Sequence, residues 1–356
     1  MAEAGLIGGQ PALVIRAAPR EPGPPAFIEA TVLPGRGMML WQARIRQANG
    51  EIIDAIASPS LSLAGQILDG GADDFAGNAS FRFGGAILAP YANRLRGRPS
   101  KVGRTLDTEV AGTTVTLPRN WGGQAPGAEQ YAMHGLILAR AFQPSVVSPA
   151  QVCGRLDAGD FEGRWPGRLT IEVDWALDAG ALRLRVTARN SGRSYAPVGL
   201  GWHPYFTIAS GDRRQARLWL AARSRVLVNN YDEVLPTGEL EPVSDSRLDF
   251  TASAGRALGD LYLDDCFTDL DTAPSGVLAE LRDPAAGLGL RLTSTSDAIR
   301  ALQVYAPPDQ AFVVIEPQFN LADPYGARWS GRDTGMRRLP PGAEITYDVC
   351  VEPFAC

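Results

Sequence analysis

Acid–base chemistry near neutral pH has few candidate residues in this sequence. Only two histidines occur among its 356 residues, His134 and His203, and imidazole is the only side chain whose ordinary pKa falls between pH 5 and 8. Glu316 follows directly after the apolar run 311–315. A carboxylate desolvated at that point would have a raised pKa, which suits a general base. The residues alone equally allow a packed core histidine at His203 and a solvated glutamate at a strand end.

Residues suited to binding hydroxyl groups lie in three segments. Asn93 and Arg94 are adjacent and can donate several hydrogen bonds to neighbouring hydroxyls. The segment 202–206, Trp-His-Pro-Tyr-Phe, surrounds the second histidine with rings that suit the wall of a saccharide-sized cleft. Asp264 and Asp265 place two carboxylates among apolar residues. Each segment could also have a purely structural role, in a surface ion pair or in a packed core, so none of them identifies a binding site alone.

Short strands are the elements expected to position these residues. Apolar and polar residues alternate with period two in several segments, and this pattern predicts strands with one buried face. The clearest are 39–46 with 51–56, joined by a turn at Asn49-Gly50, and 169–175 with 182–188, joined by a turn at 178–180. The run 311–315 predicts a strand buried on both faces.

The predicted fold is all-β, a large antiparallel β-sandwich with few short helices. The one clear helical pattern covers residues 60–68. No repeat and no change in composition divides the chain, so residues 26–356 are expected to form a single catalytic domain. Residues 1–25 are rich in Pro, Gly and Ala, and this composition predicts an N-terminal arm with little order.

Charge and motifs exclude several classes of function. The 34 basic and 39 acidic residues give a formal net charge of −5, which argues against a nucleic-acid or membrane partner. The glycine-rich and nucleophile motifs of nucleotide-binding proteins and serine hydrolases are missing. We therefore expect no cofactor and no metal, and a monomer or homodimer that acts on a small molecule.

The location expected for this protein is the cytoplasm. Residues 1–6 lack the basic-then-apolar pattern of a secretory signal, and no apolar run approaches the ~18 residues of a membrane span. The four cysteines show no zinc-type spacing, and reduced thiols are expected, although a Cys350–Cys356 disulfide would be possible in an oxidising compartment.

Seven short segments that contain these candidates follow one another in a distinctive order. They are Asn93-Arg94, His134-Gly135, His203-Pro204-Tyr205-Phe206, Pro236-Thr237-Gly238, Asp264-x-x-Phe267, Gln303-Val304-Tyr305 and Glu316-Pro317-Gln318. In this order they resemble the aldose 1-epimerases of the galactose mutarotase family. The resemblance implies a supersandwich fold with an open cleft, no cofactor, and an isomerase that interconverts the α and β anomers of a free monosaccharide.

The resemblance also implies a role for each matching residue. Glu316 would be the general base that takes the proton from the anomeric hydroxyl, and His203 the general acid that protonates the ring oxygen. Six residues would bind the sugar: His134 and Arg94 near its hydroxyls and ring oxygen, Asp264 as an acceptor, and Asn93, Trp202 and Gln318 in the floor of the cleft. Asp264 is preferred over Asp265 for its spacing to Phe267.

Three other functions stay open at this level. The first is a metal enzyme. His134, His203 and Glu316 could supply two histidines and one carboxylate to a metal, although they are spread over 180 residues. A sugar-binding protein without turnover could have the same fold. An epimerase of hexose 6-phosphates would need basic residues at the cleft rim, and Arg96, Arg98, Lys101 and Arg104 offer such a run.

Overall fold

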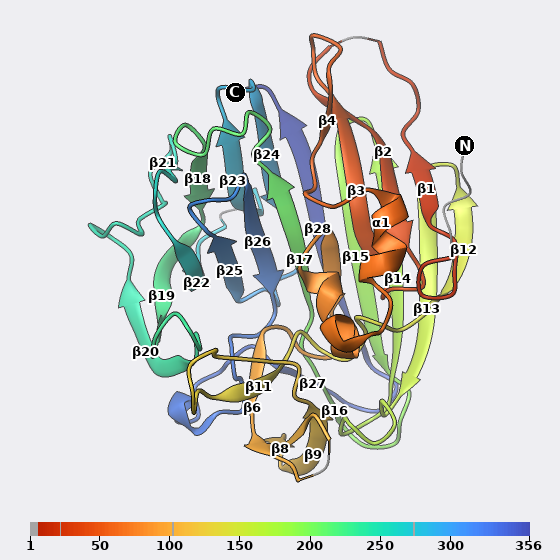
Figure 1. Ribbon diagram of the computed structural model, residues 1–356, viewed down its shortest axis with the longest axis vertical. Coiled ribbons are helices and arrows are strands. Elements are labelled where there is room, and N and C mark those ends of the chain that lie inside the picture. The colour runs from red at the N-terminus through yellow and green to blue at the C-terminus, as the bar shows by residue number, and fades with distance from the viewer. Residues whose placement is uncertain (1–5, 22, 102, 273–274) are drawn as a thin grey trace.

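Two large antiparallel sheets form the framework of the molecule (Figure 1). The structure is a computed structural model that describes residues 6–21, 23–101, 103–272 and 275–356. The first sheet has 11 strands and the second has nine. The predicted all-β class and antiparallel sandwich are confirmed, because residues from both sheets share one hydrophobic core.

The strands of the two sheets follow in spatial order. The first sheet contains β1 (Leu13–Arg16), β2 (Ala26–Leu33), β3 (Met39–Arg46), β5 (Gly85–Leu88), β17 (Gly201–Thr207), β26 (Phe312–Gln318), β25 (Ala301–Ala306), β22 (Leu263–Leu270), β19 (Ala222–Val228) and β20 (Pro236–Pro242), with β4 (Ile52–Asp54) paired to β3. The second contains β12 (Gln143–Ser148), β13 (Gln151–Gly159), β14 (Leu169–Asp178), β15 (Ala181–Asn190), β28 (Glu344–Phe354), β24 (Leu288–Thr293), β23 (Val277–Asp283), β18 (Arg217–Leu220) and β21 (Arg256–Ala257).

Smaller elements surround this framework, several of them at the lower end in Figure 1. The small sheets are β10 (Trp121–Gly122), β11 (Gln130–Met133) and β6 (Arg94–Arg96), then β7 (Arg98–Pro99), β8 (Thr105–Val110) and β9 (Thr113–Pro118), and the pair β16 (Ala196–Val198) and β27 (Arg337–Leu339). The helical segments are α1 (Leu61–Ile67) and the 3-10 segments η1 (Ala72–Phe81) and η2 (Ala327–Trp329). Within the described residues, no helix is long and apolar enough to cross a membrane.

The local expectations from the sequence are largely confirmed. β3 and β4 pair across the Asn49-Gly50 turn, and β14 pairs with β15 in an uninterrupted antiparallel register. Helix α1 covers most of the residues expected to be helical. All four cysteines are free thiols in the structure.

The prediction of a poorly ordered N-terminal arm is wrong for residues 13–16, which form strand β1. Leu13–Arg16 pairs with β2 along its full length, and Ile15 is 2% exposed in the main core. The Arg16 N–H also donates to the Pro149 carbonyl at 2.7 Å, in the turn between β12 and β13. The composition of residues 1–25 as a whole, rich in Pro, Gly and Ala, did not indicate the short strand within it. Residues 1–5 and 22 of the same stretch lie outside the described residues.

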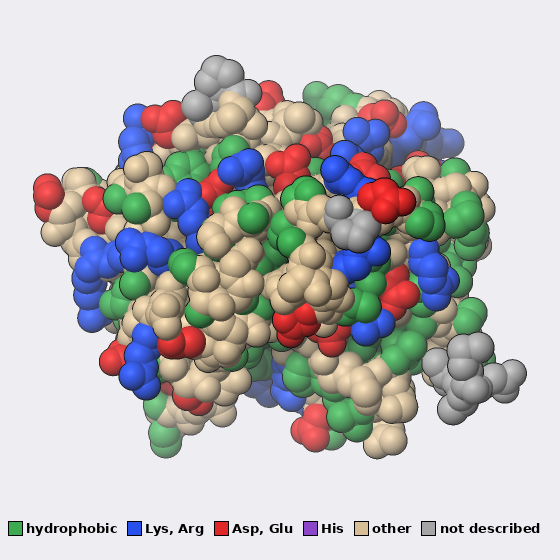
Figure 2. Space-filling model, turned by 90° about the horizontal axis from the view of Figure 1, so that it is seen from above, with side chains coloured by type: hydrophobic (Ala, Val, Ile, Leu, Met, Phe, Trp, Pro, Cys, Tyr) green, Lys and Arg blue, Asp and Glu red, His purple; other side chains and the backbone are tan. Residues whose placement is uncertain are grey.

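The two central strands of the first sheet are buried on both faces. Along β17, Trp202 packs edge-on against Trp175 of β14 with ring centroids 5.6 Å apart, so it faces the core between the sheets. On the other face of β17, the Tyr205 hydroxyl donates to the Phe81 carbonyl at 2.8 Å, which ties η1 over the sheet. On the surface seen in Figure 2, acidic and basic side chains are interspersed and no histidine is visible.

Candidate active site

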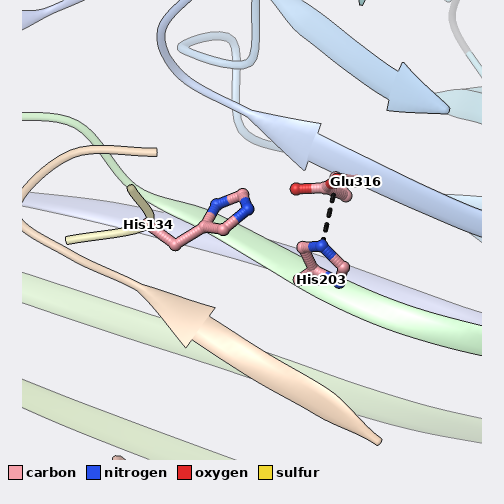
Figure 3. A group of neighbouring side chains, drawn as sticks. All are labelled: His134, His203 and Glu316. Atoms are coloured by element: carbon pink, nitrogen blue, oxygen red, sulfur yellow. Dashed lines mark ion pairs between the residues drawn. The ribbon is translucent and has the colours of Figure 1, made fainter. Parts of the chain in front are cut away.

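The two residues expected to do acid–base chemistry lie opposite each other on adjacent strands. β17 and β26 pair with Gly201 opposite Gln318 and Tyr205 opposite Val314, a register that puts His203 opposite Glu316. Directly opposed residues project from the same face of a sheet. The His203 Nε2 atom is accordingly 3.4 Å from Glu316 Oε1 (Figure 3). The strand continues through Glu316 to Gln318, so this glutamate is not at a solvated strand end.

His134 reaches the same place from a different sheet. It follows β11, whose register with β6 brings it beside Asn93, and its N–H donates to the Asn93 carbonyl at 2.9 Å. Its ring lies edge-on to His203 with centroids 4.9 Å apart. Gly135 has φ +84°, and a Cβ there would lie 2.1 Å from the Ala89 carbonyl oxygen. Only glycine therefore lets the chain turn behind His134 at this close approach.

These side chains line a cavity of about 380 Å³. Its lining residues are Phe81, Arg82, Asn93, Arg94, Trp121, Met133, His134, His203, Tyr205, Tyr262, Asp264, Gln303, Tyr305, Phe312 and Glu316. Six of these residues are phenylalanine, tyrosine or tryptophan, and eight others have charged or polar side chains. A concave site with aromatic walls and polar groups that can orient a ligand is suited to a small molecule.

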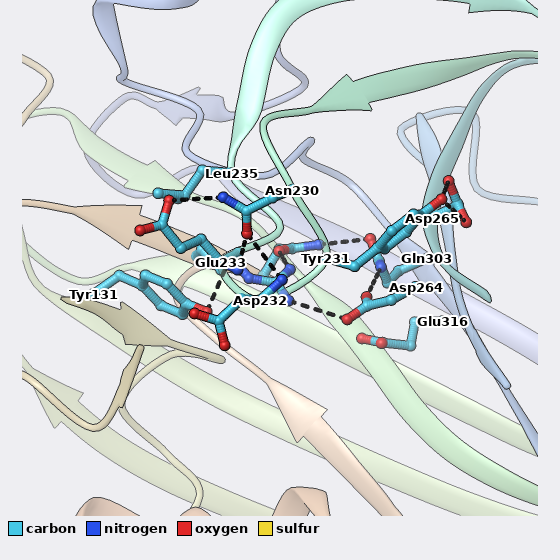
Figure 4. Close-up of polar contacts among 12 residues, drawn as sticks. Tyr131, Asn230, Tyr231, Asp232, Glu233, Leu235, Asp264, Asp265, Gln303 and Glu316 are labelled. Atoms are coloured by element: carbon cyan, nitrogen blue, oxygen red, sulfur yellow. Dashed lines mark hydrogen bonds and ion pairs between the residues drawn. The ribbon is translucent and has the colours of Figure 1, made fainter. Parts of the chain in front are cut away.

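A continuous hydrogen-bonded network holds the polar groups in place (Figure 4). Gln303 donates through Nε2 to Asp264 Oδ1 at 2.7 Å and accepts from Asn93 Nδ2 at 3.0 Å. Arg94 donates to Asn93 Oδ1 at 2.7 Å, and its Nη2 lies 3.6 Å from Asp264 Oδ2. Each group is thus oriented by a partner, which preorganises the site for a ligand.

Several buried polar atoms of the site have no partner among the described residues. They are both ring nitrogens of His134, Nδ1 of His203 and Nε of Arg94. A buried polar atom left without a hydrogen bond costs about 1–3 kcal/mol. Such atoms around one cavity are consistent with groups that pair with a bound polar molecule instead.

Burial shifts the pKa values of the central pair in opposite directions. Desolvation raises the pKa of Glu316 well above that of an ordinary carboxyl, although a hydrogen bond from Gln318 opposes this. Desolvation lowers the pKa of His203 to about 3. The pKa of His134 is also lowered, by burial and then by the charges of His203 and Arg94. Both shifts of the pair favour a proton on the carboxylate and a neutral imidazole.

Six of the eight predicted site residues line this cavity, and two do not. His203, Glu316, His134, Asn93, Arg94 and Asp264 all line it. Gln318 lies behind the lining and donates to Glu316 Oε2 at 2.8 Å. The expectation that Trp202 forms part of the floor is wrong, because neighbouring residues of a strand point to opposite faces and Trp202 faces the core.

The choice between the two neighbouring aspartates is decided by their partners. Asp264 lines the cavity, whereas Asp265 accepts hydrogen bonds from Arg225 at 2.9 Å and from the Tyr231 hydroxyl at 3.0 Å. Asp265 is fully buried by these contacts. These bonds connect it to Arg225 of β19 and to Tyr231.

Sequence reasoning missed part of the cavity wall. Gln303 and Tyr305 line the cavity and belong to one of the seven segments that carry the resemblance, which implied no role for them. Phe81, Arg82 and Trp121 come from the end of η1 and from the two-residue strand β10. These short elements show no periodicity, so no sequence signal pointed to them.

The site has the donor set of a metal centre as well as that of an acid–base pair. One ligand atom from each of His134, His203 and Glu316 can be chosen so that all three lie within 4.8 Å of one another. Two imidazoles and a carboxylate suit several divalent metals. A cation bound there would take one ligand atom each from His203 and Glu316, the two residues of the acid–base pair.

Comparisons with known proteins agree with this fold. Residues 60–349 match the model of the Aldose 1-epimerase family. The match covers most of the sequence, and the chain belongs to the aldose 1-epimerase family. No curated protein is similar enough in sequence to match.

Solved structures share the same architecture. A galactose mutarotase-like protein from Clostridium acetobutylicum superposes with a TM-score of 0.75 at 16% identity, over 99% of this chain and 98% of that one. A GalM/aldose epimerase homologue from C. elegans gives 0.70 at 19% identity, over 97% and 99%. A putative aldose 1-epimerase from Escherichia coli K12 gives 0.69 at 16% identity, over 97% and 100%. At these identities, the likeness establishes the fold.

Proposed function

We propose that this protein is an aldose 1-epimerase that interconverts the α and β anomers of an aldose by opening and reclosing its ring. Glu316 takes the proton from the anomeric hydroxyl, a carbonyl forms at that carbon, and the bond from the carbon to the ring oxygen breaks. His203 gives a proton to the ring oxygen. The open-chain aldehyde then rotates about its first carbon–carbon bond, and the reverse steps close the other anomer.

The distance between the acid and the base supports this reaction more than any other observation. The anomeric hydroxyl and the ring oxygen are bonded to one carbon, so the group that takes a proton and the group that gives one must lie close together. The 3.4 Å separation of His203 Nε2 and Glu316 Oε1 meets that requirement. Both residues line one cavity, and other polar residues of its lining can bind the other hydroxyls.

The reaction starts from a Glu316 carboxylate and a His203 imidazolium, the charged forms that burial disfavours, and burial therefore makes these forms a stronger base and a stronger acid. A carboxylate with a raised pKa is a stronger base than an exposed one, and an imidazolium with a lowered pKa is a stronger acid. Ring opening moves one proton from His203 to the substrate and another from the substrate to Glu316. The pair is left as a neutral imidazole and a carboxylic acid, which is the state that burial favours.

The other polar groups of the cavity would hold the sugar. His134 and Arg94 have unpartnered nitrogens that can bind hydroxyls or the ring oxygen, and Asp264 can accept from hydroxyls. Asn93 orients Arg94, Gln303 orients Asp264, and Gln318 orients Glu316, each through a hydrogen bond.

Optical rotation tests the proposal directly. Freshly dissolved α-glucose, α-galactose, xylose and arabinose should reach equilibrium faster with the protein than in the buffer blank. Glu316→Gln and His203→Asn should each lower the enzymatic rate by about 10²–10⁴, the usual contribution of a general acid or base. Glu109→Gln, at an exposed glutamate on β8, should keep the full rate.

Three results would count against the proposal. If no sugar of the panel or of its charged derivatives equilibrates faster than its blank, the protein binds sugars without turnover or acts on another class of molecule. Full activity in the Glu316 or His203 variant, with an unchanged melting temperature, would mean that the acid and base are assigned wrongly. An activity lost on chelation and restored by a divalent metal would favour a metal centre.

A further inference from the structure

A second hollow adjoins the cavity and is lined almost entirely by polar groups. The two hollows meet at Arg82 and Trp121, which line both. Arg104 and Arg119 line the second hollow beyond this point. Asp73 is the one acidic residue that we find among its described lining residues. We call this hollow the arginine groove.

The three arginines are brought together by the ends of short elements. Arg104 directly precedes β8 and Arg119 directly follows β9, and the Arg119 N–H donates to the Arg104 carbonyl at 2.8 Å. The Arg104 guanidinium stacks over the Phe75 ring at 4.1 Å. Arg82 follows η1, and its guanidinium lies 6.0 Å from the centre of the Trp121 ring. Aromatic faces therefore orient two of the three cations.

None of these arginines forms an ion pair with a residue that the structure describes. No carboxylate oxygen there lies within 4.0 Å of their guanidinium nitrogens, whereas Arg36 pairs with Asp74 at 2.8 Å. Three guanidinium groups around one hollow create a positive potential. Their planar forks match phosphate and carboxylate groups, which they bind through paired hydrogen bonds.

We propose that the arginine groove binds an anionic group of the substrate, a phosphate or a carboxylate, while the aldose ring lies in the cavity beside His203 and Glu316. The inference rests on the proposed function, because it needs a sugar ring at that pair. It changes the substrate class from a neutral aldose to an aldose that carries a negative charge away from the anomeric carbon.

The prediction that one basic run of the sequence lies at the cleft rim is mostly wrong for this groove. Of the run Arg96, Arg98, Lys101 and Arg104, Arg104 alone is among the groove's lining residues. Arg96 is instead paired with Glu129 at 2.6 Å. The hollow is completed by arginines at other places in the chain, which the sequence pattern could not bring together.

The test compares charged and neutral substrates of the same size. Rates of anomer exchange, corrected for the buffer blank, would be measured for glucose, glucose 6-phosphate and glucuronate. We expect kcat/KM to be at least about tenfold higher for one charged sugar than for glucose, the effect of one or two charge-assisted hydrogen bonds. The advantage should shrink as salt is raised. The phosphate and carboxylate arms show which anion is bound.

Variants then locate the effect in the groove. The double variant Arg104→Gln/Arg119→Gln should lower the ratio of charged to neutral kcat/KM by about tenfold or more. Arg98→Gln removes an exposed arginine on β7 outside the groove, and the ratio should stay as in the original protein. Thermal melts of each variant check that the fold is retained.

The outcomes separate this inference from the proposed function. Faster exchange of neutral glucose with no preference for either charged sugar would overturn the inference and leave the epimerase intact. A preference that survives in the double variant would also overturn it, because the charge would then be bound elsewhere. No exchange with any of the three sugars would instead overturn the proposed function.

Discussion

At the scale of single residues, Glu316 and His203 are ionisable groups that the fold buries almost completely. Their exposed fractions are 2% and 5%, and burial disfavours the charged form of each. Ionisable groups that are buried in an active site usually lower the free energy of unfolding. The sequence pointed to both residues because their types are scarce or unusually placed. Their separation could not be predicted, since it depends on the register between β17 and β26.

Replacing Glu316 with glutamine should therefore stabilise the fold, and more so as the pH rises. Below its ordinary pKa the carboxyl is protonated in both the folded and unfolded states. Above that value the unfolded chain loses the proton while the folded state retains it up to the raised pKa, so the original protein loses stability with rising pH. The neutral glutamine has no such loss, and we expect a gain of about 1–3 kcal/mol near pH 7.

Urea unfolding of the original protein and of Glu316→Gln at pH 4.5, 6 and 7.5 measures this difference. The exposed Glu109→Gln variant should show no comparable gain with pH. A Glu316→Gln variant that is less stable than the original at pH 7.5 would show that the carboxylate is well solvated or paired in the folded protein.

At the scale of elements, the alternation along β17 separates a structural residue from a catalytic one. Trp202 donates through Nε1 to the Gly85 carbonyl at 3.2 Å and packs in the core, while the next residue faces the cavity. The aromatic composition of the segment was evident from the sequence. Which of its residues faces which layer was not, because both faces of this strand are buried and no polar alternation marks them.

The variant Trp202→Phe should lose stability but keep its catalytic efficiency. The smaller ring leaves a void beside Trp175 and a carbonyl without its donor, and we expect a loss of about 1–3 kcal/mol in the free energy of unfolding. The value of kcat/KM at 20 °C should change little, since no cavity atom is removed. His203→Asn, on the same strand, should instead lose most of its kcat/KM and keep its stability. A large loss of kcat/KM in Trp202→Phe at unchanged stability would mean that Trp202 does contribute to substrate binding.

At the scale of the whole molecule, the sandwich could be predicted in class but not in topology. Hairpins such as β14–β15 follow from local alternation and turn residues, so they were evident in the sequence. The order β5–β17–β26 joins segments more than 100 residues apart, and no local pattern encodes such pairings. Phe81, Arg82 and Trp121 reach the cavity through this long-range order, which explains why they were missed.

The first strand gives a test of that larger arrangement. Ile15 is buried at 2%, whereas its neighbour Val14 is 38% exposed on the same strand. Ile15→Asp should lower the free energy of unfolding by about 3 kcal/mol or more, because it buries a charge. Val14→Asp should stay within about 1 kcal/mol of the original protein. Equal effects of the two changes in urea unfolding would mean that β1 is an arm loosely attached to the sheet.

The burial of both histidines in one cavity has a spectroscopic consequence. The chain contains no third imidazole, so a sample labelled with ¹⁵N only at histidine gives signals from His134 and His203 alone. The two rings lie edge to face, 4.9 Å apart. Every ring-nitrogen resonance in such a spectrum comes from the cavity, and a titration with a candidate sugar would report occupancy, tautomer and proton position without any assignment of the remaining 354 residues.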